Sequence, residues 1–176
     1  MNKSKFFYFL FLLTAVYFTS CGNESNKGGN SANTFTNDFK AHFGYNPNVQ
    51  KGKGHSDQFF YQMDSTLEFS LTFLKNFNQI SANSFAKVRF SAFVLLPDQT
   101  SSAAVTIQIW DGAGNPLKVE SKIANGSEIG LNLWKEVTIE MNLAGLYAPN
   151  HEVRCFIHNP LRQTLFVDDM KVEFFQ

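Results

Sequence analysis

Charge, cysteine and proline are all scarce in this chain of 176 residues, and the low charge already excludes one class of partner. Charged residues make up 17%, and 15 Lys and Arg balance 15 Asp and Glu, so the strongly basic surface typical of nucleic-acid-binding proteins is excluded. The low charge accompanies 20 phenylalanines, so the main body can bury a core and is not disordered. The length fits one domain and is too short for two of ordinary size.

The sequence also lacks the spacing patterns of common catalytic sites. It contains no Gly-x-Ser-x-Gly elbow, no His-Glu-x-x-His and no phosphate-binding glycine loop. Glu68, Glu140 and Glu152 could pair across strands as hydrolase carboxylates, which would require a separation of roughly 5–9.5 Å. Glutamates that alternate along a strand are more often surface residues. We therefore expect no enzyme, with a small hydrolase as the minor alternative.

The first twenty residues are typical of a secretory signal peptide. Lys3 and Lys5 precede an apolar run from Phe6 to Phe18, which is shorter than the roughly 18 residues of a membrane-spanning helix. Residues 18–21 end in Cys21 and resemble the lipobox of bacterial lipoproteins of the Bacteroidetes type, whose cysteine is acylated after cleavage. The resemblance implies a lipid on Cys21 that anchors the chain to the bacterial outer membrane, on its periplasmic or its cell-surface side. An ordinary signal peptide is the alternative.

The two cysteines cannot be partners if Cys21 carries lipid. Cys155 is then single, and it alternates with Val153 and Ile157 on the apolar face of a predicted strand, so we expect it to be buried. A catalytic thiol is the alternative, but no histidine lies at a recognisable spacing from Cys155. Residues 22–34 contain no large apolar side chain, so 21–34 is predicted to be the lipidated cysteine and a flexible linker, and 35–176 the folded domain.

From Phe35 onward, apolar residues recur with a period of two, which is typical of half-buried strands. All five prolines fall between the periodic segments, where a sheet protein must place them. No segment has a convincing helical period. The pattern predicts an all-β fold, an antiparallel β-sandwich of the jelly-roll kind, with strands within 67–73, 87–94, 105–110, 136–141, 152–158 and 164–175.

Four segments, in order, resemble those of galactose-binding-like jelly rolls, a group that includes many carbohydrate-binding modules. They are the segments 37–40, 54–64, 133–137 and 166–172. The resemblance implies the same β-sandwich fold and a core position for Trp134. Because a fold hosts many functions, it does not by itself define the ligand.

The adjacent carboxylates Asp168 and Asp169 interrupt the apolar alternation of the last predicted strand, so placing both Val167 and Met170 inward requires a β-bulge. In the modules that this chain resembles, an aspartate of this pair holds a structural Ca²⁺ with ligands from the N-terminal segment. The resemblance therefore implies a Ca²⁺ site made by Asp168, Asp169 and Asp38. Lys40 and Asp57 stand where the family often has Glu and Gly, so a metal-free or ion-paired site is the alternative.

Trp110 shares a strand face with Gln108, opposite the predicted core face. An exposed aromatic ring beside hydrogen-bonding side chains suits a sugar, whose faces are apolar and whose edges are polar. Packing of Trp110 under the 111–115 hairpin is the alternative. The predicted ligand-binding residues are Trp110, Gln108, Arg89, Arg154, Phe156 and His158.

These observations favour a lipid-anchored, non-catalytic glycan-binding protein. The alternative is an accessory or scaffold lipoprotein that binds another envelope protein, which should expose a contiguous apolar patch of several hundred Å². No nucleic-acid partner is expected.

Overall fold

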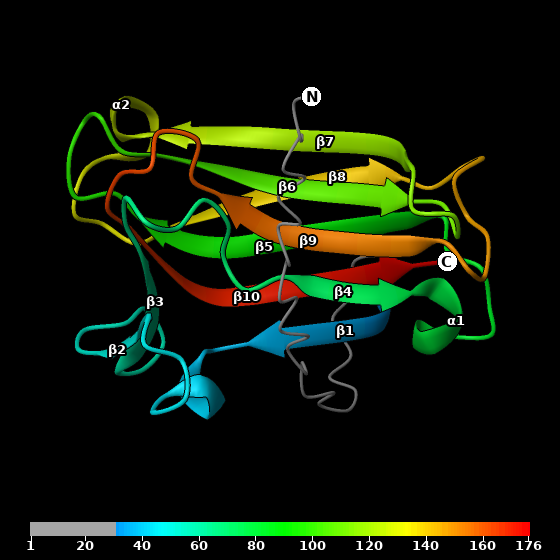
Figure 1. Cartoon of the computed structure of the whole chain (residues 1–176), viewed down its shortest axis with the longest axis horizontal. Coiled ribbons are helices and arrows are strands. Elements are labelled where there is room, and N and C mark those ends of the chain that lie inside the picture. Colours follow the sequence, from blue (N-terminus) through cyan, green and yellow to red (C-terminus); the bar gives the residue numbers. More distant parts are fainter. Residues whose placement is uncertain (1–30) are drawn as a thin grey trace, which may run out of the picture.

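The computed structural model describes residues 31–176, which form two antiparallel β-sheets packed face to face (Figure 1). The predicted β-sandwich is confirmed. The lipid site at Cys21, the leader and residues 22–30 of the predicted linker lie outside the described residues.

The first sheet, sheet A, has six strands and is built around β10 (Leu165–Phe175). One edge of β10 pairs with β5, and β5 pairs with β8; the other edge pairs first with β3 and then with β1. β2 pairs with β3 at the border of the sheet. The remaining bounds in this sheet are β1 (Ser31–Asn37), β2 (Val49–Lys51), β3 (Phe59–Met63), β5 (Lys87–Leu95) and β8 (Lys135–Asn142).

The second sheet, sheet B, has four strands in the order β4, β9, β6, β7, and it forms the front layer in Figure 1. Its strands are β4 (Phe73–Asn76), β6 (Ser102–Trp110), β7 (Pro116–Asn125) and β9 (Glu152–His158). Three single-turn helices lie between strands: η1 (Lys40–His42), α1 (Phe77–Ile80) and α2 (Gly126–Ile129). Asn76 and Asn125 cap α1 and α2, which is a common role of asparagine.

The alternation read from the sequence correctly predicts the inward faces of the central strands. Val105, Ile107 and Ile109 of β6 are fully buried between the sheets, as are Val153 and Cys155 of β9. The predicted bulge is also confirmed, because the pairing of β10 with β5 shifts register between Asp168 and Lys171. Val167 and Met170, on either side of the shift, are both fully buried.

Two boundaries differ from the sequence expectations. Residues 31–34, expected in the linker, belong to β1. Their backbone pairs with β10, so this part of the strand forms although it has no large apolar side chain. The strand expected within 67–73 begins only at Phe73. At Ser70, the side-chain Oγ accepts a hydrogen bond from the Ile157 N–H, and such local side-chain bonds interrupt a regular ladder. Phe69 therefore points out to solvent while Leu71 is buried.

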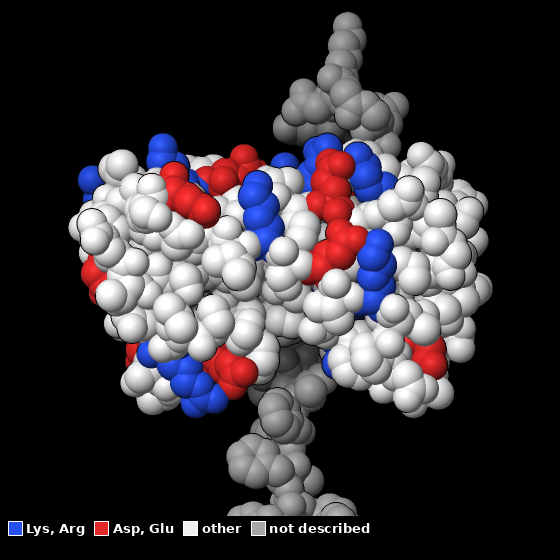
Figure 2. Space-filling model, turned by 90° about the horizontal axis from the view of Figure 1, so that it is seen from above, with Lys and Arg blue, Asp and Glu red and all other residues white. Residues whose placement is uncertain are grey.

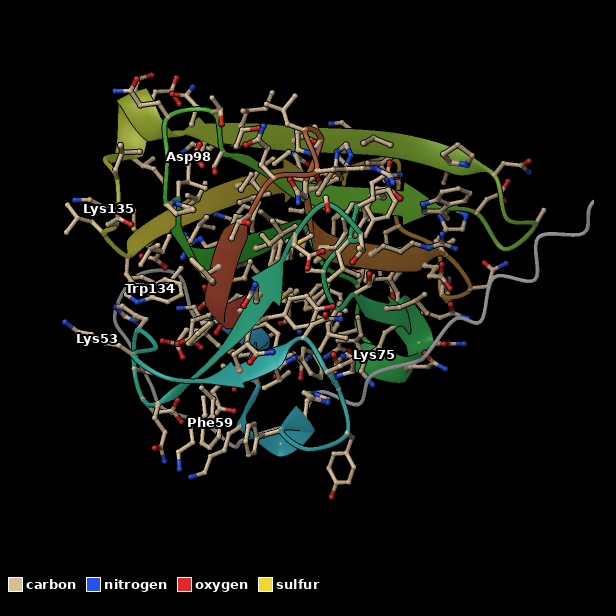
Figure 3. All side chains as sticks on the ribbon, turned by 60° about the vertical axis from the view of Figure 1, so that its left-hand side comes forward. Lys53, Phe59, Lys75, Asp98, Trp134 and Lys135 are labelled. Atoms are coloured by element: carbon tan, nitrogen blue, oxygen red, sulfur yellow. The ribbon has the colours of Figure 1, made fainter. Side chains whose placement is uncertain are left out.

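Trp134 is not a core residue, contrary to the expectation from the resemblance. It is half-buried and lies beside Lys53 at one end of the sandwich (Figure 3). Its indole N–H donates a 3.4 Å hydrogen bond to the Lys53 carbonyl, and its ring meets the edges of His55 and Phe60. Trp134 therefore covers the 52–58 loop instead of filling the space between the sheets.

Candidate functional site

The outer face of sheet B, which points away from sheet A, carries a tryptophan with a cation over its ring. Strand pairing places Gln108 opposite Arg154 and Trp110 opposite Glu152. The Arg154 guanidinium carbon lies 4.1 Å from the centroid of the Trp110 ring, and the Trp110 Nε1 donates a 2.8 Å hydrogen bond to Gln108 Oε1. The Arg154 Nε also donates to Glu152 Oε1. These contacts fix the orientation of both the ring and the guanidinium.

A polar cavity of 220 Å³ opens beside this tryptophan. Its wall consists of residues from β4, β6 and β9 and from the loops at this end of sheet B: Asn76, Trp110, Asp111, Gly112, Gly114, Asn150, Glu152 and Arg154. We call it the Trp110 pocket. Amide and carboxylate groups beside an aromatic ring offer donors, acceptors and an apolar surface to one small ligand.

The 111–115 hairpin that closes the pocket is held by Asp111. The Asp111 carboxylate accepts hydrogen bonds from the backbone N–H groups of Ala113 and Asn115 and from the Asn115 amide, and the hydrogen bonds from Asn115 do most to lower the pKa of Asp111. Gly112 permits the close approach of the hairpin to the 149–150 loop, since a Cβ there would lie 2.2 Å from Asn150 Nδ2. The hairpin and this loop therefore form one continuous wall.

An aromatic group continues the same outer face away from the pocket. Phe69 stacks on His158 with 5.1 Å between ring centroids, and it meets Phe156 edge-on at 5.4 Å. Phe156, predicted as a contact residue, is nearly buried, whereas Phe69 is exposed. The structure therefore places five of the six predicted ligand-binding residues on one face, and Phe69 is the exposed aromatic among their neighbours.

Arg89 is the predicted ligand-binding residue that the structure separates from the others. It lies on β5 in sheet A, where it binds Glu140 at 2.6 Å and packs over the Phe175 ring. Lys87 binds the same glutamate, and the hydrogen bonds from Lys87 and Arg89 lower the pKa of Glu140. Periodicity placed Arg89 on an outward face, but that face belongs to the opposite sheet.

The three glutamates considered as hydrolase carboxylates each have their own partners. Glu140 lies on sheet A with Lys87 and Arg89. Glu68 binds Arg162 at 2.6 Å, whereas Glu152 on β9 binds Arg154. Glu68 also lies 3.6 Å from His158, at the other end of β9 from Glu152, so the described contacts bring no two of these glutamates together.

The carboxylates predicted to hold Ca²⁺ are already engaged by protein donors. Asp168 is fully buried, and its Oδ2 and Oδ1 accept the backbone N–H groups of His55 and Asp169 at 2.7 and 2.8 Å. Asp169 accepts from Ser56 Oγ at 2.7 Å and lies 2.7 Å from His55 Nδ1. The 52–58 loop can approach this closely because residue 54 is glycine. Any other residue there would place a Cβ 2.9 Å from Asp168 Oδ2.

Asp38 does not complete a metal site with this pair. Asp38 and Asp169 line a 370 Å³ cavity on sheet A, but Asp168 is not part of its wall. Within residues 31–176, no group of three or more His, Cys, Asp or Glu side chains could hold a metal ion. With these donors on Asp168 and Asp169, and with Asp38 placed apart from Asp168, the residues do not fit the Ca²⁺ site implied by the resemblance.

Asn76, Asp111, Asn150 and Glu152 line the Trp110 pocket but were not predicted as ligand-binding residues. Asp111 was interpreted only as part of a turn. Glu152 had a detectable signal, since it is the first residue of the predicted alternating strand and shares its outward face with Arg154. Asn76 is the last residue of β4 and Asn150 lies in the loop before β9, so only the pairing of these two strands brings them together.

The part of the chain that the structure describes, residues 31–176, contains no helix with the length and hydropathy of a membrane span.

No protein-family model and no curated protein sequence matches this chain. Solved carbohydrate-binding modules share its fold. The CBM22-2 xylan-binding domain of Paenibacillus barcinonensis Xyn10C is 15% identical with a TM-score of 0.53, over 80% of this chain and 98% of that domain. The C-terminal family 22 carbohydrate-binding module of Clostridium thermocellum Xyn10B is 9% identical with a TM-score of 0.55, over 80% and 91%. The fold is therefore the β-sandwich of the carbohydrate-binding modules.

Proposed function

We propose that this protein is a non-catalytic glycan-binding module, with the Trp110 pocket as its binding site. The observation that carries the proposal is the indole ring held beside the carboxylate, amide and guanidinium groups that line one cavity. A sugar needs this combination, because its C–H faces are apolar and its hydroxyl edges both donate and accept hydrogen bonds. The fold that the chain shares with a xylan-binding domain and with a family 22 carbohydrate-binding module supports the same class of ligand.

The size of the cavity limits what it can take. At 220 Å³ it lies below the roughly 300–1,000 Å³ of sites for drug-sized ligands. A single sugar residue, either at a chain end or in a side branch, is the unit that fits. Further residues of the glycan would lie along the outer face of sheet B, where Phe69 and His158 provide an exposed aromatic surface.

Affinity electrophoresis tests the proposal directly. The protein from residue 22 onward is run through gels that each contain one polysaccharide, with xylan among them, and its mobility is compared with that of Trp110→Ala and Arg89→Ala. Retardation by one polysaccharide, lost in Trp110→Ala and kept in Arg89→Ala, is the expected result. Arg89 is the matched control because it lies on the opposite sheet. Absence of retardation in every gel would reject the glycan proposal and favour a protein partner.

We also propose that a lipid on Cys21 tethers the module to the outer membrane of a bacterium. The support is the lipobox-like end of the leader. Full-length protein produced in a bacterial host grown with labelled palmitate should incorporate label, and Cys21→Ser should not. Protease treatment of intact cells distinguishes the two membrane sides, because only a surface-exposed domain is cut. A wild-type protein without label would exclude the anchor.

A further inference from the structure

Strand β7 is an edge strand whose apolar side chains are exposed. It pairs with β6 on one side, and in the described chain no strand pairs with its other side. Leu117, Val119 and Ile123 are 43, 51 and 60% exposed. Pairing of Val119 with Gln108 and of Ile123 with Ala104 puts these side chains on the outer face of sheet B. β7 forms the upper border of the sandwich in Figure 1.

The other borders of the two sheets differ from this one. β4 and β2, at the far ends of sheets B and A, have four and three residues, and β1, which pairs only with β10, has seven, whereas β7 has ten. β8, with eight residues, carries Lys135, Glu136 and Glu140, and β7 also carries three charges, Lys118, Glu120 and Lys122, but β7 in addition exposes Leu117, Val119 and Ile123. Natural proteins protect sheet edges with short strands and charges, and a long edge with exposed apolar side chains is a surface for pairing with another strand. Seen from above, positive and negative side chains are intermixed, with wide uncharged areas between them (Figure 2).

We infer that β7 pairs antiparallel with β7 of a second copy of this chain, about a two-fold axis at Ser121. In this register Val119 lies opposite Ile123 of the other copy, and Glu120 lies opposite Lys122. Each pair occurs twice by symmetry, so apolar side chains meet apolar ones and acids meet bases. Directly opposed pairs of these kinds stabilise antiparallel strands.

Neighbouring registers that also place outward-facing side chains opposite outward-facing ones are less favourable. A shift that centres the axis on Glu120 places Glu120 opposite itself and Lys118 opposite Lys122, so like charges meet. A shift to Val119 restores the acid–base pairing through Lys118, but it overlaps only seven residues of each strand instead of nine. The sequence of β7 therefore selects the Ser121 register. Glu120 contacts Lys118 at 2.5 Å and is one-third exposed, and the exposed Lys122 donates a 3.3 Å hydrogen bond to the Thr138 carbonyl of its own β8, which it would exchange for Glu120 of the other copy.

The pairing joins two four-stranded sheets into one of eight strands. The two-fold axis is perpendicular to the sheet, so both outer faces point the same way. Both Trp110 pockets therefore lie on one side of the dimer, an arrangement that allows two contacts with one polymer. The dimer itself does not depend on the proposed glycan function, since its evidence lies entirely in β7.

Disulfide crosslinking of the full chain in cells tests the register. Ser121→Cys places two thiols directly opposite each other, at ~4.5–5.5 Å between Cβ atoms, close to the range that a disulfide spans. In the same register, the two thiols of Val119→Cys are four residues apart along the strand, or ~13 Å, which is too far. Ser65→Cys, an exposed position in the turn after β3, controls for random collision, and the wild type controls for Cys21 and Cys155. Cells are treated with an oxidant and analysed on non-reducing gels.

A dimer band at least tenfold stronger for Ser121→Cys than for the other three proteins is expected. A stronger band for Val119→Cys would overturn the proposed register. Equal bands in all the variants, or none above the wild type, would overturn the dimer. As a second test, Glu120→Lys in the Ser121→Cys chain should weaken the band, because it opposes two lysines. The double exchange Glu120→Lys with Lys122→Glu should restore it, and failure of this rescue would also count against the pairing.

Discussion

The guanidinium of Arg154 lies over the ring of Trp110, with 4.1 Å between the guanidinium carbon and the ring centroid. The two residues are on adjacent strands, and Glu152, two positions before Arg154 on the same face of β9, binds the same guanidinium. The ring face that Arg154 covers is closed to a ligand. A sugar bound in the proposed Trp110 pocket would therefore contact the part of the ring that Arg154 leaves open.

Replacing Arg154 by alanine should lower the free energy of unfolding by about 1 kcal/mol, because a half-buried cation–π contact is lost. The measurement is urea denaturation followed by fluorescence in a Trp134→Phe background, so that the signal comes from Trp110. Arg162→Ala is the matched control: Arg162 forms an exposed ion pair with Glu68, and such pairs contribute roughly 0–1 kcal/mol. Equal losses in the two variants would contradict a special contribution from the ring contact.

Calcium should not stabilise this protein, because the oxygens of Asp168 and Asp169 already accept hydrogen bonds from protein groups. An ion at 100 times its Kd would add about 2.7 kcal/mol to the free energy of unfolding. Thermal unfolding in the presence of Ca²⁺ or of a chelator should therefore give the same Tm, whereas His55→Ala should lower it. The imidazole stacks on Phe93 at 3.4 Å between ring centroids, so its removal breaks packing as well as the contact with Asp169. A higher Tm with Ca²⁺ would restore the metal interpretation.

The period-two pattern could predict most of the sandwich, because it reports directly which side chains face the core. For the same reason it correctly placed Gln108, Trp110 and Arg154 on outward faces. It could not separate Arg89 from them, since alternation gives the face of a strand but not the sheet to which the strand belongs. Only the pairing of β5 with β10 and β8 places Arg89 on the other side of the molecule.

Loop contacts account for what the sequence could not predict. The Trp110 pocket needs Asn76 and Asn150, which are 74 positions apart and carry no periodic signal. The resemblance implied a Ca²⁺ site at Asp168 and Asp169, but their partners His55 and Ser56 lie more than 110 residues earlier in the chain. Donors brought in by a distant loop decide whether such carboxylates bind a cation or the protein itself.

Asp168 should make the stability of the protein fall as the pH rises from about 4 to 7. Burial, with the nearby Asp169 carboxylate, raises the pKa of Asp168 to about 6, even though the His55 N–H bond acts in the opposite direction. The unfolded chain has the ordinary pKa near 3.9, so the native state binds more protons in this range and loses stability as they dissociate. The effect is on the order of 2 kcal/mol.

The test compares wild type with Asp168→Asn, whose side chain does not titrate. Urea denaturation between pH 4 and 7.5 gives the free energy of unfolding of each protein, and the wild-type value minus the variant value should decrease with pH. Asp64, Asp98 and Asp111 have lowered pKa values and opposite pH dependence, but they are common to both proteins and cancel in the difference. A difference that does not change with pH would contradict the raised pKa.

Thiol titration of the full chain purified from bacterial membranes should detect no reactive cysteine in the native protein and one after unfolding. Cys155 is fully buried opposite Ile107 and Phe73, and burial raises the pKa of its thiol, so neither access nor ionisation favours reaction. If Cys21 is lipidated, it contributes no thiol in either state. The absorbance of the dithionitrobenzoate reaction, before and after addition of guanidinium chloride, gives the number of reactive thiols per chain in the native and in the unfolded protein. As a control, Cys155→Ala should show no reactive thiol in either state. One thiol before unfolding and two after it in the wild type would mean that Cys21 is free.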